Sequence, residues 1–180
     1  MRVIAGTARG VPLAAPRGRA TRPITDRVKE TLFAILGDRV PDARVADLYA
    51  GSGAIGIEAL SRAARSVDFV ERDREALEAL RANLQRTRLT EGTAIHAIDV
   101  ERHLASPNGA VWDLAILDPP YETRDMVAPL RALLPRLAPG ATVVIKHFWR
   151  TELPDIDGLR VERQRRFGET MLTFLATEDA

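Results

Sequence analysis

Cysteine is absent from this sequence of 180 residues, which excludes disulfide bonds and thiolate metal sites. Histidine is scarce, and His96, His103 and His147 do not have the spacing of metal ligands. Long apolar runs are absent too, since none approaches the roughly 20 residues of a membrane-spanning helix. The N-terminus has no apolar signal-peptide segment. We therefore expect a cytoplasmic protein with no metal centre and no membrane partner.

Lysine is almost absent as well. Lys29 and Lys146 are the only two, and arginine supplies the rest of the 26 basic side chains. The net charge is only +1, but arginines gather near the two ends of the chain. They are Arg2, Arg9, Arg17, Arg19, Arg22 and Arg27 at one end, and Arg160, Arg163, Arg165 and Arg166 near the other. This distribution indicates a polyanion such as nucleic acid bound by one face. Solvated arginines in a genome that prefers Arg to Lys are the alternative.

The order of apolar segments predicts one α/β domain, for which the chain is long enough. From residue 44 onwards, strand-length apolar runs alternate with helix-length amphipathic segments. The predicted strands are 45–49, 67–70, 93–98, 111–117 and 141–148. The predicted helices are 54–64, 73–88, a short helix after Asp99, and 126–137. Residues 158–166 and 170–176 are expected to form a closing antiparallel pair. This pattern predicts a mostly parallel seven-stranded sheet with helices on both faces.

The chain before this alternation has a different character. Residues 1–15 predict a short β-hairpin, and residues 16–23 an extended basic linker with a proline at each end. Thr25 or Asp26 then caps a helix that runs through about Leu36.

A glycine motif follows the first predicted parallel strand and opens the next helix. Gly51, Gly53 and Gly56 have the GxGxxG spacing of nucleotide-binding βα units. Glycine lets the backbone approach a ligand closely, and a helix N-terminus offers free N–H groups. Glu71, at the end of the second strand, could accept hydrogen bonds from both ribose hydroxyls of an adenosine. The sequence thus predicts an adenosine-type cofactor. A tight βα turn with a solvated Glu71 is the alternative.

Two further carboxylates bear on which adenosine cofactor binds. Asp47 lies four residues before Gly51, where its charge would repel a pyrophosphate but suits the ammonium group of a methionine moiety. Asp99 ends the third strand, where it could accept a hydrogen bond from an adenine amino group. It could also simply cap the helix that follows. These positions favour S-adenosylmethionine over a nicotinamide dinucleotide.

The fourth predicted strand ends abruptly at Asp118-Pro119-Pro120-Tyr121. The prolines stop the strand, so a carboxylate and a ring lie at the edge where open α/β sheets bind ligands. The amine of a nucleobase is a poor nucleophile because its lone pair is conjugated with the ring. Asp118 and the Pro119 carbonyl could accept its two N–H protons and favour the pyramidal form, while Tyr121 stacks on a flipped base. The motif predicts methylation of an amine. A strand-ending turn with a capping aspartate is the alternative.

Several longer stretches carry a family resemblance. They are residues 2–6 (RVIAG), 21–30 (TRPITDRVKE) with 32–33 (LF), 47–62 (DLYAGSGAIGIEALSR), 69–73 (FVERD), 118–121 (DPPY), 167–170 (FGET) and 172–173 (LT). With these stretches the chain resembles, over nearly its whole length, the RsmD family of bacterial small-subunit rRNA guanine-N2 methyltransferases. DPPY alone is shared with DNA adenine-N6 and cytosine-N4 methylases, whereas residues 21–30 are more discriminating.

The resemblance implies a class I, Rossmann-like methyltransferase fold. It also implies methyl transfer from S-adenosylmethionine to the exocyclic N2 amine of one guanine in 16S rRNA, with the base flipped into the DPPY pocket. The cofactor residues implied are Thr25, Asp47, Gly51, Ser52, Gly53, Glu71, Arg72, Asp99 and Val100, and the catalytic residues are Asp118, Pro119, Pro120 and Tyr121. The RNA-binding residues implied are Arg9, Arg17, Arg19 and Arg22, in an extension of residues 1–23 before a methyltransferase domain of residues 24–180. The implied partner is 16S rRNA, alone or within a small-subunit assembly intermediate, bound by a monomer.

The chain departs from the family at two places. Relatives carry a more basic hairpin, whereas here only Arg9 remains, which shifts the expected RNA contact to the linker arginines. Lys146 stands where many relatives have an acidic residue. Three other functions fit parts of the pattern: adenine-N6 or cytosine-N4 methylation of DNA or RNA, nicotinamide-dependent oxidoreduction, and RNA binding without catalysis.

Overall fold

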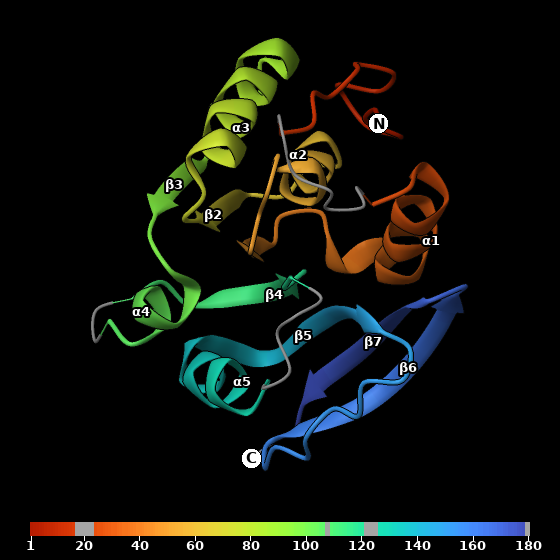
Figure 1. The fold of residues 1–180 in the computed structure, drawn as a ribbon, viewed down its shortest axis with the longest axis vertical. Coiled ribbons are helices and arrows are strands. Elements are labelled where there is room, and N and C mark those ends of the chain that lie inside the picture. The colour runs from red at the N-terminus through yellow and green to blue at the C-terminus, as the bar shows by residue number, and fades with distance from the viewer. Residues whose placement is uncertain (17–23, 107–108, 121–125, 179–180) are drawn as a thin grey trace.

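A seven-stranded sheet runs through the centre of the molecule in the order β3-β2-β1-β4-β5-β7-β6 (Figure 1). The computed structural model describes residues 1–16, 24–106, 109–120 and 126–178. The strands are β1 (Arg44–Leu48), β2 (Ser66–Glu71), β3 (Thr93–Ala97), β4 (Trp112–Leu117), β5 (Leu137–Phe148), β6 (Leu159–Phe167) and β7 (Thr170–Thr177). The first five pair in parallel, and β7 runs antiparallel to both of its neighbours. The predicted class I methyltransferase fold, with its C-terminal antiparallel pair, is confirmed.

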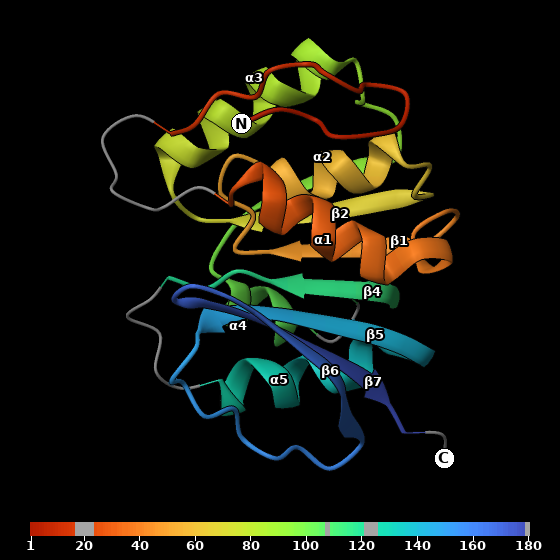
Figure 2. The same cartoon turned by 90° about the vertical axis from the view of Figure 1, so that its right-hand side faces the viewer.

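Helices cover both faces of this sheet (Figure 2). On one face lie α1 (Asp26–Leu36), α2 (Ala54–Ser61) and α3 (Arg74–Thr87), and on the other α4 (Val100–Leu104) and α5 (Val127–Leu133). Short 3-10 turns, η1 (Gly37–Arg39) and η2 (Leu134–Arg136), follow α1 and α5. Along β4, Leu114 and Ile116 pack on the α1–α3 side, and Ala115 and Leu117 pack on the α4–α5 side. A strand buried on both faces has no polar side, which is why β4 is apolar except for Asp113 near its start.

The predicted helix starts are confirmed by their caps. Thr25 accepts a hydrogen bond from the Val28 N–H, and Asp73 accepts one from the Ala76 N–H. The predicted start of the fifth strand at residue 141 is wrong, because β5 already begins at Leu137. Its pairing with β4 jumps from Leu137 to Thr142. The intervening Pro139 and Gly140 therefore lie in a bulge. No hydrogen bond between the strands is required there, so the lack of an N–H on proline costs nothing.

The first sixteen residues pack against the main core as a looped segment. The predicted hairpin is present as a single antiparallel bridge between Arg2 and Pro12, flanked by backbone bonds such as Val3 N–H to Val11. The side chains of Val3, Ala8 and Leu13 are buried. On α3, the Asn83 side chain accepts a hydrogen bond from the Ala14 N–H at 2.8 Å and donates one to the Ala14 carbonyl at 2.9 Å. This segment is thus part of the same hydrophobic core as α2 and α3.

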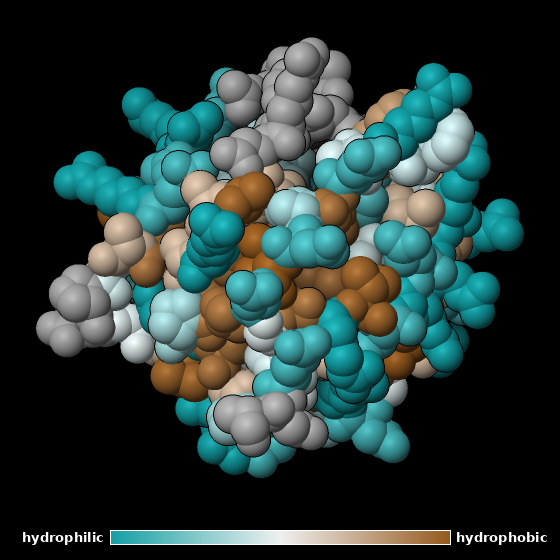
Figure 3. Space-filling view, turned by 90° about the horizontal axis from the view of Figure 1, so that it is seen from below, coloured by the Kyte–Doolittle hydropathy of each residue, from teal (hydrophilic) through white to brown (hydrophobic). Residues whose placement is uncertain are grey.

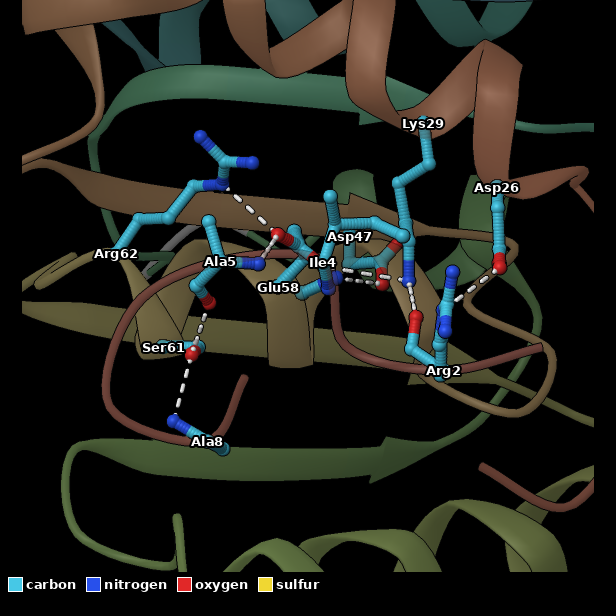
Figure 4. A network of polar contacts seen from close by, with 11 residues as sticks. Arg2, Ile4, Ala5, Ala8, Asp26, Lys29, Asp47, Glu58, Ser61 and Arg62 are labelled. Carbon is cyan, nitrogen blue, oxygen red and sulfur yellow. Dashed lines mark hydrogen bonds and ion pairs between the residues drawn. The ribbon is translucent and has the colours of Figure 1, made fainter. Parts of the chain in front are cut away.

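A buried ion pair ties this segment to two helices (Figure 4). The Glu58 carboxylate on α2 lies 3.2 Å from the Lys29 ammonium on α1, and both side chains are 0% exposed. Glu58 also accepts hydrogen bonds from the N–H groups of Ile4 (2.7 Å) and Ala5 (3.0 Å) and from Arg62 (2.9 Å). Burial lowers the pKa of Lys29, and the adjacent Glu58 opposes this effect. Nothing in the residue pattern had singled out this cluster.

The exterior is mixed. Figure 3 shows the molecule from below relative to the view of Figure 1, and there hydrophilic side chains surround a central area of apolar ones. Within the described ranges, no helix has both the length and the apolar character needed to span a membrane.

Removing Glu58 tests the importance of the buried pair. Glu58→Ala leaves an uncompensated cation at Lys29 and unpaired N–H groups at Ile4 and Ala5, so we expect a loss of about 3–5 kcal/mol in the free energy of unfolding. Denaturant unfolding measures it. The control is Glu78→Ala, which removes an exposed pair with Arg74 and should stay within about 0.5 kcal/mol. Equal losses in the two variants would contradict a structural role for the buried pair.

Candidate functional site

The carboxyl ends of the parallel strands meet at one edge of the sheet, where a cavity of about 810 Å³ opens. Its lining includes residues at or just after the ends of β1, β2, β3 and β4, so loops distant in sequence are brought together there. The predicted site residues that line it are Asp47, Gly51, Ser52, Glu71, Arg72, Asp99, Val100, Asp118, Pro119 and Pro120. The structure thus gathers most of the predicted cofactor and catalytic residues around one space.

The other predicted site residues lie elsewhere. Thr25 and Gly53 are not in the cavity wall: Thr25 caps α1, and Gly53 is the first residue before α2. Arg9 is exposed in the N-terminal loop. Tyr121 and the linker arginines Arg17, Arg19 and Arg22 fall outside the described residues.

The three motif glycines have different structural roles. Gly51 has a positive φ of 56° and open space beside it, so it shapes the turn that lines the cavity. A Cβ on Gly53 would lie 2.2 Å from Leu80, and one on Gly56 would lie 2.3 Å from Phe69. Gly53 and Gly56 therefore serve close packing of α2 and its loop onto α3 and β2. Of the three, only Gly51 is available for approach to a ligand.

Glu71 holds the cavity loops in place through backbone hydrogen bonds. Its Oε2 accepts from the Gly51 N–H at 2.8 Å, and its Oε1 accepts from the N–H groups of Arg72 and Asp73, both at 2.8 Å. A carboxylate offers about four acceptor positions, so one position remains on Oε2 for a ligand hydroxyl. The alternative, in which Glu71 is merely a solvated residue at the end of a strand, does not agree with these three hydrogen bonds.

Asp99 combines a structural and a cavity-lining position. Its Oδ1 accepts hydrogen bonds from the N–H groups of Glu101 and Arg102, so it is the N-cap of α4. Its Oδ2 lies 3.0 Å from the Arg72 guanidinium. Both Asp99 and Arg72 line the cavity, as does the next residue, Val100. The alternative that Asp99 caps the following helix is thus correct, and Asp99 lines the cavity as well.

Asp47 is the most deeply buried carboxyl of the site, with 1% of its surface exposed. Its Oδ2 accepts a hydrogen bond from the Gly56 N–H at 2.8 Å. The pKa of Asp47 is raised to about 8, mainly by burial and in smaller part by the negative charges of Asp118 and Glu71, while the Gly56 N–H opposes the rise. A bound cation would reverse this effect by favouring the ionised form. Asp47 is therefore suited to a positively charged ligand group.

The opening of the DPPY motif lies at the end of β4, beside β1 and β5. The Asp118 N–H donates to the Leu48 carbonyl at 3.2 Å, which extends the β1–β4 ladder to the aspartate. The Lys146 ammonium, near the end of β5, lies 2.6 Å from Asp118 Oδ1. Burial raises the pKa of the Asp118 carboxyl, and Lys146 opposes the rise. Pro119 and Pro120 complete this part of the wall.

Sequence reasoning missed several cavity residues. Lys146 stood out only as a departure from the family, although its place near the carboxyl end of a parallel strand is a usable signal. Tyr49 also lines the cavity, and burial raises the pKa of its hydroxyl to about 12. Met1 and Ile24 add apolar wall from residues before the first strand. No periodicity or motif identifies these two positions in advance.

The second basic cluster lies on the edge strand β6, most of which is exposed. Arg166 of this strand stacks over the ring of Trp149 at 3.7 Å, and Arg150 lies 4.7 Å from the same ring centroid. Trp149 follows the end of β5, at the edge of the sheet that carries the cavity.

The chemistry of the cavity wall fits S-adenosylmethionine. The ligand carries a sulfonium, an ammonium, two ribose hydroxyls and an adenine ring. The acidic residues of the wall include Asp47, Glu71 and Asp99, whose carboxylates can accept hydrogen bonds from its cations and other donors. Ile98 and Val100 offer apolar surface for a flat ring. Four strand ends at one edge supply all of these groups.

Known proteins resemble the chain over most of its length. The model of the family Conserved hypothetical protein 95 matches residues 1–176. A Bacillus subtilis protein named "Putative rRNA methyltransferase YlbH" is 37% identical over 175 residues, which are 94% of this chain and 95% of that protein. The ribosomal RNA small subunit methyltransferase D of Escherichia coli K12 is 38% identical over 121 residues, 67% of this chain and 60% of that protein. The solved structure titled "Putative methyltransferase yhhF from Escherichia coli" has a TM-score of 0.90 at 29% identity, covering 100% of this chain and 99% of that one.

The raised pKa of Asp47 predicts a pH-dependent stability. The ordinary pKa is 3.8 and the folded value about 8, so between these values the folded protein keeps a proton that the unfolded chain releases. The stability contributed by Asp47 therefore falls as pH rises through this range. Asp47→Asn keeps an acceptor for the Gly56 N–H but cannot ionise. The Tm of the ligand-free variant minus the Tm of the unmodified protein should therefore increase as the pH is raised from 5 to 8.

Thermal unfolding at several pH values checks this expectation. Asp38→Asn, at an exposed position in η1, is the control and should follow the unmodified protein. Parallel Tm curves for the Asp47→Asn variant and the unmodified protein would show that Asp47 does not titrate in this range.

Proposed function

This chain belongs to the Conserved hypothetical protein 95 family, the RsmD family, and we propose that it methylates the N2 amine of a guanine in 16S rRNA with S-adenosylmethionine. The observation that carries the proposal is the shared cavity. Asp118 and its two prolines line the same space as the glycine loop and the carboxylates of Asp47 and Glu71. An amine-binding motif and a cofactor site are thereby adjacent, as direct methyl transfer requires.

The cofactor assignment follows the acceptors in the cavity wall. S-adenosylmethionine supplies a methyl group on a sulfonium, which becomes a thioether as the methyl passes to the amine and one amine proton is released. Asp47 binds the ammonium group, because a buried carboxylate gains most from a cation. Glu71 accepts one ribose hydroxyl at the free position on Oε2. Asp99 accepts from the adenine amino group while it continues to cap α4. The methyltransferase relatives support this use of the cofactor.

Asp118 and the Pro119 carbonyl bind the amine. Two acceptors fixed at the end of β4 withdraw the N–H protons from the plane of the base and favour a pyramidal, nucleophilic nitrogen. The rigidity of the two prolines keeps both acceptors in position before the substrate arrives. Reaching this site requires the base to leave its helix, and Tyr121 is assigned to stack on the flipped guanine.

The substrate assignment rests on the relatives and on the basic N-terminus. One relative is named as an rRNA methyltransferase and another as a small-subunit rRNA methyltransferase. Arg9, with Arg17, Arg19 and Arg22, is assigned to the RNA backbone in an extension of residues 1–23. The substrate is 16S rRNA, alone or within a small-subunit assembly intermediate, and the protein acts as a monomer.

Product mapping with a catalytic variant tests the proposal. Incubation of 16S rRNA or small-subunit particles with labelled S-adenosylmethionine should yield N2-methylguanosine, identified by mass spectrometry of digested RNA. Asp118→Ala removes an acceptor needed in the transition state and should lower kcat by about 10²–10³-fold. Its affinity for S-adenosylhomocysteine should stay near that of the unmodified protein, because the amine site is separate from the cofactor groups.

The control is Asp113→Asn, at the opposite end of the same strand, where Asp113 pairs with Arg44. It should keep full methyl transfer. Methylated adenine or cytosine as the product would refute the guanine assignment. Loss of cofactor affinity in Asp118→Ala, with normal turnover at saturation, would refute the role of Asp118.

Replacing the linker arginines tests the RNA assignment. Converting Arg17, Arg19 and Arg22 to Gln should weaken binding to 16S rRNA and reduce the slope of log K against log[salt] by about 0.7–0.9 for each phosphate that is no longer neutralised. The control converts Arg81, Arg88 and Arg131, exposed side chains of or next to α3 and α5, with the same charge change. An unchanged salt slope in the linker variant would remove the linker from the RNA site.

A further inference from the structure

We propose that Lys146 is a positioning residue for methyl transfer, which holds Asp118 as an ionised carboxylate and directs one of its oxygens toward the amine. The inference rests on the proposed function above, since it assigns Lys146 a part in the same reaction. It concerns a residue outside the glycine loop, the DPPY motif and the predicted cofactor set.

The contact follows from the register of the sheet. β4 and β5 are parallel, and Leu117 pairs with Ile145 at the carboxyl end of their ladder. Asp118 directly follows β4, and Lys146 is the next residue of β5, so their side chains leave the sheet side by side and on the same face. The Nζ–Oδ1 distance is 2.6 Å, and the Lys146 side chain is only 9% exposed. A lysine held this closely, near the end of a buried strand, is fixed with respect to the aspartate.

The surrounding charges explain what this cation does. The carboxylates of Asp47, Glu71, Asp73, Asp99 and Glu101 line the same cavity, and the positively charged residues in its wall are Arg72, Arg74, Lys146 and the N-terminal residue Met1. Arg72 pairs with Asp99 and Arg74 with Glu78, whereas Lys146 pairs with Asp118. Burial and neighbouring negative charge both favour the protonated form of a carboxyl. Lys146 is the cation in direct contact with Asp118, and its charge favours the ionised form of that carboxyl.

The ionised form matters for the reaction. A carboxylate accepts hydrogen bonds at both oxygens, whereas a protonated acid carries an O–H that would point at an amine N–H. Within the described part of the chain, the Asp118 carboxylate contacts Lys146 through Oδ1. Oδ2 is therefore the oxygen that Lys146 leaves to the incoming amine. Lys146 acts through Asp118 and does not itself need to touch the base.

Two substitutions separate charge from packing. Lys146→Met keeps an unbranched apolar stem of similar length but removes the cation, and Lys146→Arg keeps the cation. In the ligand-free protein, the pKa of Asp118 is measured from its ¹³C carboxyl resonance, assigned by its absence from the Asp118→Asn spectrum. We expect Lys146→Met to raise this pKa by about 1–3 units, the range for loss of a close opposite charge. Lys146→Arg should return it to near the unmodified value.

Kinetics provide the second measurement. The acidic limb of the kcat profile should move to higher pH in Lys146→Met by the same amount as the pKa. At pH values above the new limb, kcat should recover to within a few-fold of the unmodified enzyme, and KM for S-adenosylmethionine should not change. Lys146→Arg should restore the limb. If Lys146→Met does not fold, Lys146→Gln replaces it in both measurements.

The outcomes distinguish this inference from the proposed function. An unchanged Asp118 pKa in the uncharged variants, or a kcat lowered equally at all pH values, would overturn the role of Lys146 and leave guanine methylation standing. Absence of N2-methylguanosine with the unmodified enzyme would overturn the proposed function. The ¹³C titration would still decide whether Lys146 controls the ionisation of Asp118, because it needs no substrate.

Discussion

Parallel strand pairing is the constraint on which the rest of this structure depends. Because β1 to β5 run in the same direction, their carboxyl ends share one edge, and whatever follows each strand is delivered to the same place. Asp47, Glu71, Asp99 and Asp118 are far apart in sequence, yet all four line one cavity. The apolar strands between them contribute no chemistry, but their burial on both faces fixes the positions of these four carboxyl groups.

Bringing so many carboxyl groups together has an electrostatic cost, and the structure meets it in a different way at each one. Asp47 is buried with a raised pKa and one backbone donor. Glu71 accepts from three backbone N–H groups. Asp99 has a helix N-terminus and an arginine, and Asp118 has a lysine. These four environments should give the groups different charges and different free acceptor positions, which is how similar side chains acquire separate roles.

The sequence was sufficient for most of the fold and for much of the cavity. Strong local signals were available there: the caps at Thr25, Asp73 and Asp99, the apolar run of β4, and the glycine motif followed by Glu71. It was insufficient wherever the local structure or the role of a residue depends on a contact with a distant part of the chain. The bulge at Pro139 depends on pairing with β4, which no local pattern contains. The roles of Gly53 and Gly56 depend on side chains of α3 and β2. The pairs Lys29–Glu58 and Lys146–Asp118 join residues 29 and 28 positions apart.

The N-terminal segment has a consequence for how the chain is made. Its backbone is held by Glu58, Ser61 and Asn83, between 53 and 69 residues further along. During synthesis these residues therefore leave the ribosome before their partners on α2 and α3, and they cannot form these contacts until that later part of the chain has been made. Contacts of such sequence separation are slow to form, because the loop must close before they contribute any stability. Residues 4–14 can therefore reach their final positions only after residues 58–83 have been made.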